Sequence, residues 1–167
     1  MANFAILVLS DTRSTGEKED KCLPAIEGFL KGKGDDVVKT GICADEFGLI
    51  QKTLKEWVDA GDADVILTSG GTGVSPRDVT PEATRPLLDR EIPGIPEAMR
   101  AESLKKTIHA VISRGLAGLI GDTLVINLPG SPKAAVENLE AVHKAIDHIV
   151  KKAKGDKSDC GENGGST

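Results

Sequence analysis

The chain has 167 residues, of which 39% are hydrophobic and 28% are charged, and its formal net charge is −5. A chain of this length is predicted to form one domain whose core needs no disulfide or metal. The negative charge argues against nucleic-acid binding, which needs a positive field over the phosphates, and an aromatic content of 2% argues against surfaces that stack bases.

Apolar runs and helical spacings alternate along the first half of the chain. Pro24 is expected in the first turn of a helix, because a proline in mid-helix is costly. Asp45 is expected to be an N-cap, the residue whose side chain accepts a hydrogen bond from the first helical turn. The predicted elements are a buried strand at 4–9, a polar loop at 10–20, a helix over 23–30, a strand at 37–43, a helix with an apolar stripe over 47–58, and a strand at 65–67.

The second half repeats this alternation. Thr80 is predicted to be an N-cap followed by Pro81 at the first helical position, and Ser131 with Pro132 repeats that arrangement. The predicted elements are a bend and short helix over 92–104, a hairpin of two strands at 116–120 and 123–128, and a long final helix with an apolar face over 136–150.

Strands that alternate with helices are typical of an α/β fold. We predict a three-layer α/β/α arrangement, in which a mostly parallel sheet carries helices on both faces and a small antiparallel hairpin. Residues 1–153 are expected to form a single domain. Residues 154–167 are rich in Gly, Ser, Lys and Asp and are predicted to be a disordered tail.

The cysteines and the first residues bear on the cellular environment. Cys22, Cys43 and Cys160 lie at no metal-binding spacing, which favours a reducing compartment. The first apolar run is too short for a signal sequence or a membrane span, so we expect a cytoplasmic protein without membrane contact. Apolar residues at 92–99 and 116–120 are expected on the surface, which favours a closed homo-oligomer.

A glycine-rich segment, TSGGTGVSPRDVTPEA at 68–83, follows the third predicted strand. Ligands of parallel sheets bind beyond the carboxyl ends of the strands. Glycine loops there expose backbone N–H groups, and a following helix N-terminus adds a positive dipole, so the two together bind anions. Pro129–Ser131 has the same design. The segment lacks the Gly-Lys-Ser/Thr of a P-loop, so both a phosphate site and a plain tight turn remain open.

Two aspartates follow predicted strand ends. Asp45 and Asp78 are expected at the same edge of the sheet, and two carboxylates together with ligand phosphates are a usual way to hold Mg²⁺. The plain alternatives are a helix cap for Asp45, an Asx turn for Asp78 and a solvated side chain for Arg77.

The segments TSGGTGVSPRDVTPEAT and INLPGSPKAA resemble the molybdenum-cofactor biosynthesis domain, in particular molybdopterin adenylyltransferases and the G domain of gephyrin-type proteins. VLSDTRSTGEKED, IPGIPEAMR and ISRGLAG fit the same family in order, so the resemblance covers about Ala5 to Lys152. It implies Mg²⁺- and ATP-dependent transfer of AMP onto the terminal phosphate of molybdopterin, with release of pyrophosphate. It also implies a homotrimer, sometimes a hexamer, and hand-over of the product to a molybdenum insertase.

The resemblance also implies roles for individual residues. Asp45 and Asp78 match the essential, metal-binding acids of the family, and Ser113 lies near the expected pterin side. The residues that match its nucleotide- and molybdopterin-binding loops are Ser10, Asp11, Ser14, Gly70, Gly71, Thr72, Gly73, Gly130 and Ser131.

Two other functions remain open. One is a pterin-binding or scaffolding module without catalysis. The other is a nucleotide pyrophosphatase-like relative that shares the glycine loop. Relatives of the second kind tend to carry an acid where Arg77 stands, so the resemblance favours the molybdopterin function.

Overall fold

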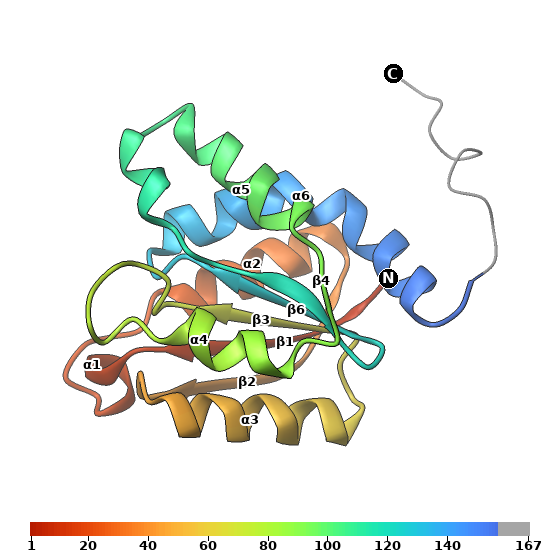
Figure 1. Cartoon of the computed structure of the whole chain (residues 1–167), viewed down its shortest axis with the longest axis horizontal. Coiled ribbons are helices and arrows are strands. Elements are labelled where there is room, and N and C mark those ends of the chain that lie inside the picture. The colour runs from red at the N-terminus through yellow and green to blue at the C-terminus, as the bar shows by residue number, and fades with distance from the viewer. Residues whose placement is uncertain (157–167) are drawn as a thin grey trace.

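The computed structural model describes residues 1–156, and within them six strands form one sheet in the order β2-β1-β3-β6-β5-β4 (Figure 1). The neighbours β2, β1, β3 and β6 are parallel, whereas β5 is antiparallel to β6 and β4 is antiparallel to β5. The strands span Asn3–Leu9 (β1), Asp36–Cys43 (β2), Val65–Ser69 (β3), Arg90–Glu91 (β4), Ala117–Ile120 (β5) and Thr123–Leu128 (β6).

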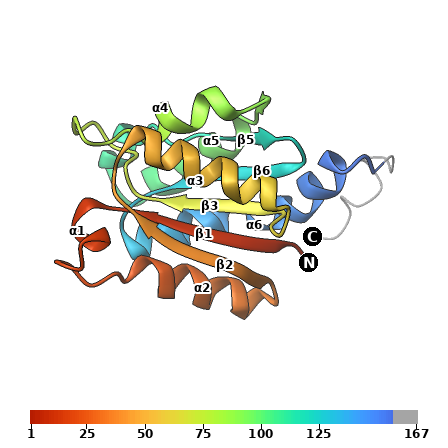
Figure 2. The same ribbon diagram turned by 90° about the horizontal axis from the view of Figure 1, so that it is seen from below.

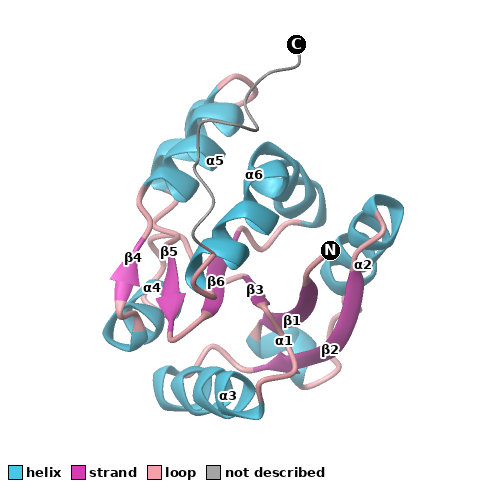
Figure 3. Cartoon of the chain, turned by 90° about the vertical axis from the view of Figure 1, so that its right-hand side faces the viewer, coloured by secondary structure: helices cyan, strands magenta, loops and turns pink. Residues whose placement is uncertain are grey.

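Helices cover both faces of this sheet, as Figures 2 and 3 show. The helices α2, α5 and α6 pack on one face, and α3 and α4 pack on the other. This arrangement confirms the predicted three-layer fold with a mostly parallel sheet and an antiparallel β5–β6 hairpin. The helices span Asp11–Ser14 (α1), Cys22–Lys33 (α2), Phe47–Ala60 (α3), Thr80–Thr84 (α4), Gly94–Leu104 (α5) and Pro132–Ala153 (α6), with 3-10 turns at Arg85–Leu87 (η1) and Ile108–Ile112 (η2).

The central strands are apolar on both faces because helices cover both. Successive side chains of a strand point to opposite sides, so Ile6 of β1 packs with α2 and α6 while Leu7 packs with α3. Both side chains are almost completely buried. The continuous apolar run at the start of the chain therefore follows from the position of β1 inside a parallel sheet.

Three local predictions were wrong. Asp45 is not an N-cap, because α3 begins at Phe47 and its N-cap is Glu46, which makes no side-chain capping bond. Thr80 lies one residue inside α4, whose N-cap is Val79. The segment predicted as a polar loop at 10–20 contains the short helix α1, which Ser10 caps by accepting a hydrogen bond from the backbone N–H of Arg13. In contrast, Ser131 caps α6 as predicted.

The predicted surface positions of two apolar segments were also wrong. Ile95 and Met99 are buried under α6, and Ala117 and Leu119 are buried within the sheet. One group of exposed apolar side chains lies instead near η2, at Leu104, Ile108, Val111 and Ile112. Others lie on β2, at the start of α3, in the loop after β3 and at the N-terminus.

The C-terminal end of α6 bears on two further predictions. Lys154, which we expected in a disordered tail, forms an ion pair with Asp64, and the rest of that prediction, residues 157–167, lies outside the described residues. None of the helices in residues 1–156 has both the length and the apolar character needed to cross a bilayer.

Candidate functional site

The carboxyl ends of β1, β2, β3 and β6 meet at one edge of the sheet, on the left in Figure 1. Backbone hydrogen bonds join the loops that leave this edge. The N–H of Ser10 donates to Cys43 over 2.9 Å, and the N–H of Gly70 donates to Leu128 over 3.1 Å. Segments distant in sequence therefore form one continuous surface.

The loop after β3 needs glycine at two positions. Gly70 and Gly71 have φ angles of +117° and +64°, which residues with a side chain rarely adopt. A Cβ on Gly70 would lie 2.2 Å from the carbonyl oxygen of Leu9, and a Cβ on Gly71 would lie 2.2 Å from Oγ1 of Thr80. The loop is therefore wedged between the end of β1 and the start of α4.

Several backbone donors of this edge are unused. Within residues 1–156, the N–H groups of Gly71, Thr72 and Gly73 donate to no protein acceptor, and neither do those of Gly130 and Ser131. Ser131 also precedes the N-terminus of α6, a helix of 22 residues that adds a positive dipole. Free N–H groups beside a helix N-terminus are the elements of an anion site.

Asp11 and Asp45 are linked by reciprocal hydrogen bonds between the first two loops. The N–H of Asp11 donates to Oδ2 of Asp45 over 3.2 Å, and the N–H of Asp45 donates to Oδ1 of Asp11 over 3.0 Å. Arg77 then binds Asp11 with Nε and Nη2, both over 2.9 Å. Arg77, for which a solvated side chain was one prediction, thus joins the glycine loop to α1.

The carboxylates of Asp45 and Asp78 border the same glycine loop. Oδ1 of Asp45 lies 3.0 Å from where a Cβ on Gly71 would stand, and Oδ2 of Asp78 lies 2.8 Å from the corresponding position on Gly73. Asp78 also accepts a hydrogen bond of 2.9 Å from the N–H of Ser75, three residues earlier. An Asx turn would use the N–H two residues later, but the N–H of Thr80 donates to the carbonyl oxygen of Gly71, so that alternative was wrong. The structure brings the two predicted acids together around the loop.

The electrostatics of the two linked aspartates differ. Burial raises the pKa of the Asp45 carboxyl, and the negative charges of Asp11 and Asp78 raise it further. A hydrogen bond from the N–H of Asp11 and the positive charge of Arg77 lower this pKa, but the net shift is upward. The Arg77 guanidinium lowers the pKa of Asp11. Oδ1 of Asp45 is buried and has no hydrogen-bond partner among residues 1–156.

These observations fit a divalent cation at Asp45 and Asp78. An unpartnered carboxylate oxygen within a group of negative charges is an unmet ligand for a hard cation. Within residues 1–156 no group of three or more His, Cys, Asp or Glu side chains could hold a metal. A cation here would therefore take part of its coordination from a ligand or water.

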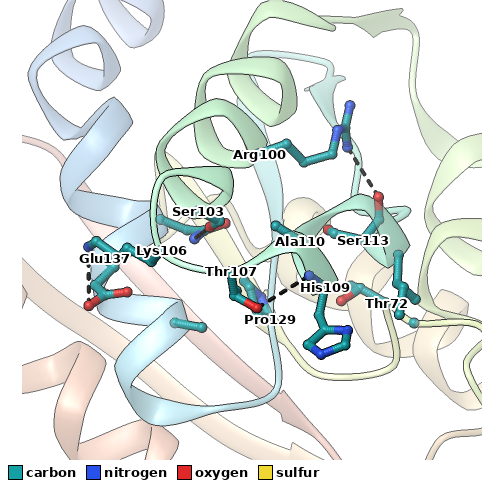
Figure 4. A pocket seen from close by; sticks show the side chains of 14 residues that line it. Thr72, Arg100, Ser103, Lys106, Thr107, His109, Ala110, Ser113, Pro129 and Glu137 are labelled. Carbon is teal, nitrogen blue, oxygen red and sulfur yellow. Dashed lines mark hydrogen bonds and ion pairs between the residues drawn. The ribbon is translucent and has the colours of Figure 1, made fainter.

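A cavity of about 350 Å³ adjoins the glycine loop (Figure 4). Thr72 and Gly73 form one side of it, and α5, η2 and α6 form the others. Ser113, predicted to lie near a pterin, lines this cavity, and its carbonyl oxygen accepts a hydrogen bond of 3.5 Å from Nη1 of Arg100. The glycine loop therefore borders the cavity and also contacts the carboxylates of Asp45 and Asp78.

Three other predicted site residues, Ser10, Ser14 and Gly130, have structural contacts in this edge. The side-chain hydrogen bonds of Ser10 and Ser14 stay within residues 10–14. Gly130 packs against the glycine loop, because a Cβ at this position would lie 3.3 Å from Cα of Gly70.

Arg114 is a site residue that the sequence did not reveal. Its Nε donates to the carbonyl oxygen of Gly73 over 2.7 Å, and its Nη2 donates to that of Asp78 over 2.8 Å. The side chain also pairs with Glu82. Arg114 directly follows Ser113, yet no local pattern indicates contacts with a loop about 40 residues earlier. It holds both ends of the segment that carries Asp78.

The fold and this edge define a three-layer α/β protein with glycine loops and paired carboxylates at the carboxyl ends of its parallel strands. The chain belongs to the family described as a probable molybdopterin binding domain, which matches residues 5–148.

Individual relatives support this membership. The molybdopterin adenylyltransferase of Escherichia coli (strain K12) is 40% identical over 149 residues, which cover 88% of this chain and 76% of the relative. The molybdenum cofactor synthesis protein cinnamon of Drosophila melanogaster is 41% identical over 88% of this chain, which spans only 25% of that longer protein. The crystal structure of the molybdopterin biosynthesis enzyme MoaB from Thermus thermophilus has a TM-score of 0.87 at 47% identity, with 93% of this chain and 98% of that chain covered.

Proposed function

We propose that this protein transfers AMP from ATP to the terminal phosphate of molybdopterin, in a Mg²⁺-dependent reaction that releases pyrophosphate. One observation carries the proposal. In the part of the chain that the structure describes, the buried Oδ1 of Asp45 has no partner, and it lies beside a loop whose N–H groups at Gly71, Thr72 and Gly73 have no acceptor. A phosphate ligand with its cation satisfies both. Relatives at 40% and 41% identity carry the name molybdopterin adenylyltransferase, which supports a role in molybdenum cofactor biosynthesis.

The residues of the chain act by positioning and charge. Mg²⁺ would be held by Asp45 and Asp78 and would supply positive charge against the phosphates of ATP. The free N–H groups of the glycine loop bind phosphate oxygens, and Arg114 fixes that loop through two of its carbonyl groups. Transfer of this kind depends on orientation and charge neutralisation. The attacking oxygen belongs to a phosphate that is already anionic, so no general base is required.

The cavity beside Thr72 and Ser113 is assigned to the pterin. Its volume of about 350 Å³ lies within the range of roughly 300–1,000 Å³ typical of small-molecule sites. A molybdopterin in this cavity would point its phosphate across the glycine loop towards the nucleotide. This assignment agrees with the predicted position of Ser113.

Pyrophosphate release tests the proposal and separates it from the two other functions. The purified protein is incubated with ATP alone and with ATP plus molybdopterin, each with and without Mg²⁺. We expect pyrophosphate only when all three components are present. A scaffolding module would bind molybdopterin without releasing pyrophosphate, and a pyrophosphatase-like relative would consume the nucleotide without molybdopterin.

Assembly and context stay proposals from the family resemblance. We propose a homotrimer or hexamer, a cytoplasmic location, hand-over of the product to a molybdenum insertase, and a single domain over residues 1–153. Light scattering tests the first of these, and a monomer of 17.5 kDa at micromolar concentration would contradict it.

A further inference from the structure

A second cavity, of about 370 Å³, lies between the segment after α1 and the start of α6. Its lining is basic, although the whole chain has a net charge of −5. The residues that line it are Arg13, Lys18, Glu19, Lys21 and Pro132.

The two lysines of this cavity are available for a ligand. Within residues 1–156, Lys18 and Lys21 form no ion pair, and both are exposed. Pro132 lies at the start of α6, so the positive end of a helix of 22 residues borders the same space. The local field therefore favours an anion.

Arg13 has an unmet hydrogen bond at this cavity. Its Nε is buried and has no hydrogen-bond acceptor within the described residues. Oδ1 of Asp20 lies 3.7 Å from this Nε, which makes an ion pair but is beyond hydrogen-bond distance. The carboxylate of Asp20 instead accepts hydrogen bonds of 3.0 Å from the N–H groups of Cys22 and Leu23 at the start of α2. A buried guanidinium N–H without an acceptor is costly, and a ligand oxyanion would satisfy it.

The basic cavity adjoins the candidate site through Gly130. Nη1 and Nη2 of Arg13 donate long hydrogen bonds of 3.5 and 3.4 Å to the carbonyl oxygen of Gly130. Gly130 in turn packs against Gly70 of the glycine loop. Arg13 is also two residues after Asp11, which is hydrogen-bonded to Asp45. Arg13 therefore connects the basic cavity to Gly130, which packs on the glycine loop.

We infer that Arg13, Lys18 and Lys21 bind the pyrophosphate part of the nucleotide, an inference that rests on the proposed function. In the transfer, an oxygen of the molybdopterin phosphate forms a bond to the α-phosphorus of ATP. The bond from that phosphorus to the oxygen bridging to the β-phosphate breaks, and its electron pair leaves with pyrophosphate. The three cations stabilise the charge that develops on this leaving group. None of the residues that line the cavity is aromatic, so it suits the pyrophosphate part of the nucleotide better than the adenine base.

Calorimetric binding of inorganic pyrophosphate, ATP, AMP and molybdopterin tests the inference. The variant is Lys18→Gln with Lys21→Gln, because both side chains are exposed and their replacement leaves the core unchanged. We expect pyrophosphate and ATP to bind about tenfold more weakly for each lysine lost, the size of one charge-assisted hydrogen bond, and AMP to bind within about twofold of the wild-type value. The matched control is Lys133→Gln on the first turn of α6, whose side chain is 85% exposed and does not line the cavity.

Each contrary result has a distinct meaning. Unchanged binding of pyrophosphate and ATP by the double variant, or an equal loss for AMP, overturns the inference. Weaker binding of molybdopterin with unchanged binding of ATP would assign the cavity to the molybdopterin phosphate and would also overturn it. Wild-type protein that releases no pyrophosphate from ATP and molybdopterin would refute the proposed function itself, whatever the variant binds.

Discussion

Replacing Asp45 with Asn separates its charge from its hydrogen bonds. Oδ2 of Asp45 accepts from the N–H of Asp11, and the amide oxygen of Asn can do the same. The N–H of residue 45, which donates to Oδ1 of Asp11, is unchanged by the substitution. The start of α3 does not depend on this side chain, because Glu46 is the N-cap. The variant therefore keeps the fold and loses one negative charge.

The pKa of the Asp45 carboxyl determines whether Asp45→Asn stabilises or destabilises the fold. Burial, Asp11 and Asp78 raise the pKa of the Asp45 carboxyl in the folded protein. A carboxyl whose pKa is raised by folding stabilises the folded protein when it is protonated. This contribution to the free energy of unfolding is complete at a pH below the pKa of the unfolded chain, and it is lost as the pH rises through the pKa of the folded protein. The variant should thus melt at or above the wild-type temperature at pH 7, and the difference should disappear as the pH falls towards the ordinary aspartate pKa of about 3.9.

The effect on activity should be large. Metal stabilisation of transition-state charge is worth several kcal/mol, and each 1.36 kcal/mol is about tenfold in rate. We therefore expect Asp45→Asn to reduce pyrophosphate release on the order of a hundredfold or more. The assay measures that rate as a function of Mg²⁺ concentration, beside thermal melts between pH 4 and pH 8. A variant that kept more than about a tenth of the wild-type rate at saturating Mg²⁺ would refute the metal role. A marked loss of melting temperature at pH 7 would show that the carboxylate stabilises the fold.

Three further predictions follow from the same structure. Asp78→Asn keeps an acceptor for the N–H of Ser75, so we expect unchanged melting but a rate lowered about a hundredfold; near-normal pyrophosphate release would contradict this. His143→Ala removes the 2.6 Å partner of the buried Asp35 carboxylate. This should cost about 1–3 kcal/mol and lower the melting temperature by roughly 2–4 °C per kcal/mol, whereas an unchanged melt would refute the contribution of the pair. Burial, followed by nearby carboxylates, raises the pKa of the Cys43 thiol to about 11. Iodoacetamide at pH 8 should therefore leave Cys43 unmodified in the folded protein, and mass spectrometry that finds it alkylated at the rate of a free thiol would contradict this.

The sequence predicted those parts of the fold that depend on local patterns. The strand β1 was evident because it is apolar on both faces, and the start of α6 was evident because Ser131 and Pro132 form a local cap. The strand β4 was not predicted, since it has two residues and exists only through pairing with β5. The segment at 116–120 was expected on the surface, because apolar character alone does not reveal that Ala117 and Leu119 pack in the core cluster with α5 and α6.

In the candidate site, too, the residues could be predicted from local patterns but their contacts could not. Asp45, Asp78 and the glycine loop were predicted because each follows a strand end or belongs to a recognisable segment. The contacts that connect them join residues far apart in the chain, such as Asp11 with Asp45 and Arg114 with Gly73. No spacing within one segment contains that information. The same reason explains why Asp45 was mistaken for a helix cap.

The position of β6 has a consequence for how the protein is made. β6 is the last of the six strands that the structure describes, yet it lies between β3 and β5, which are both synthesised earlier. Until residues 123–128 leave the ribosome, one edge of β3 is unpaired and the Gly130 loop does not exist. Long-range strand pairing is slow, and unpaired strand edges favour aggregation. A nascent chain should therefore acquire its ligand-binding edge only at the end of synthesis, when β6 inserts and α6 packs against the sheet.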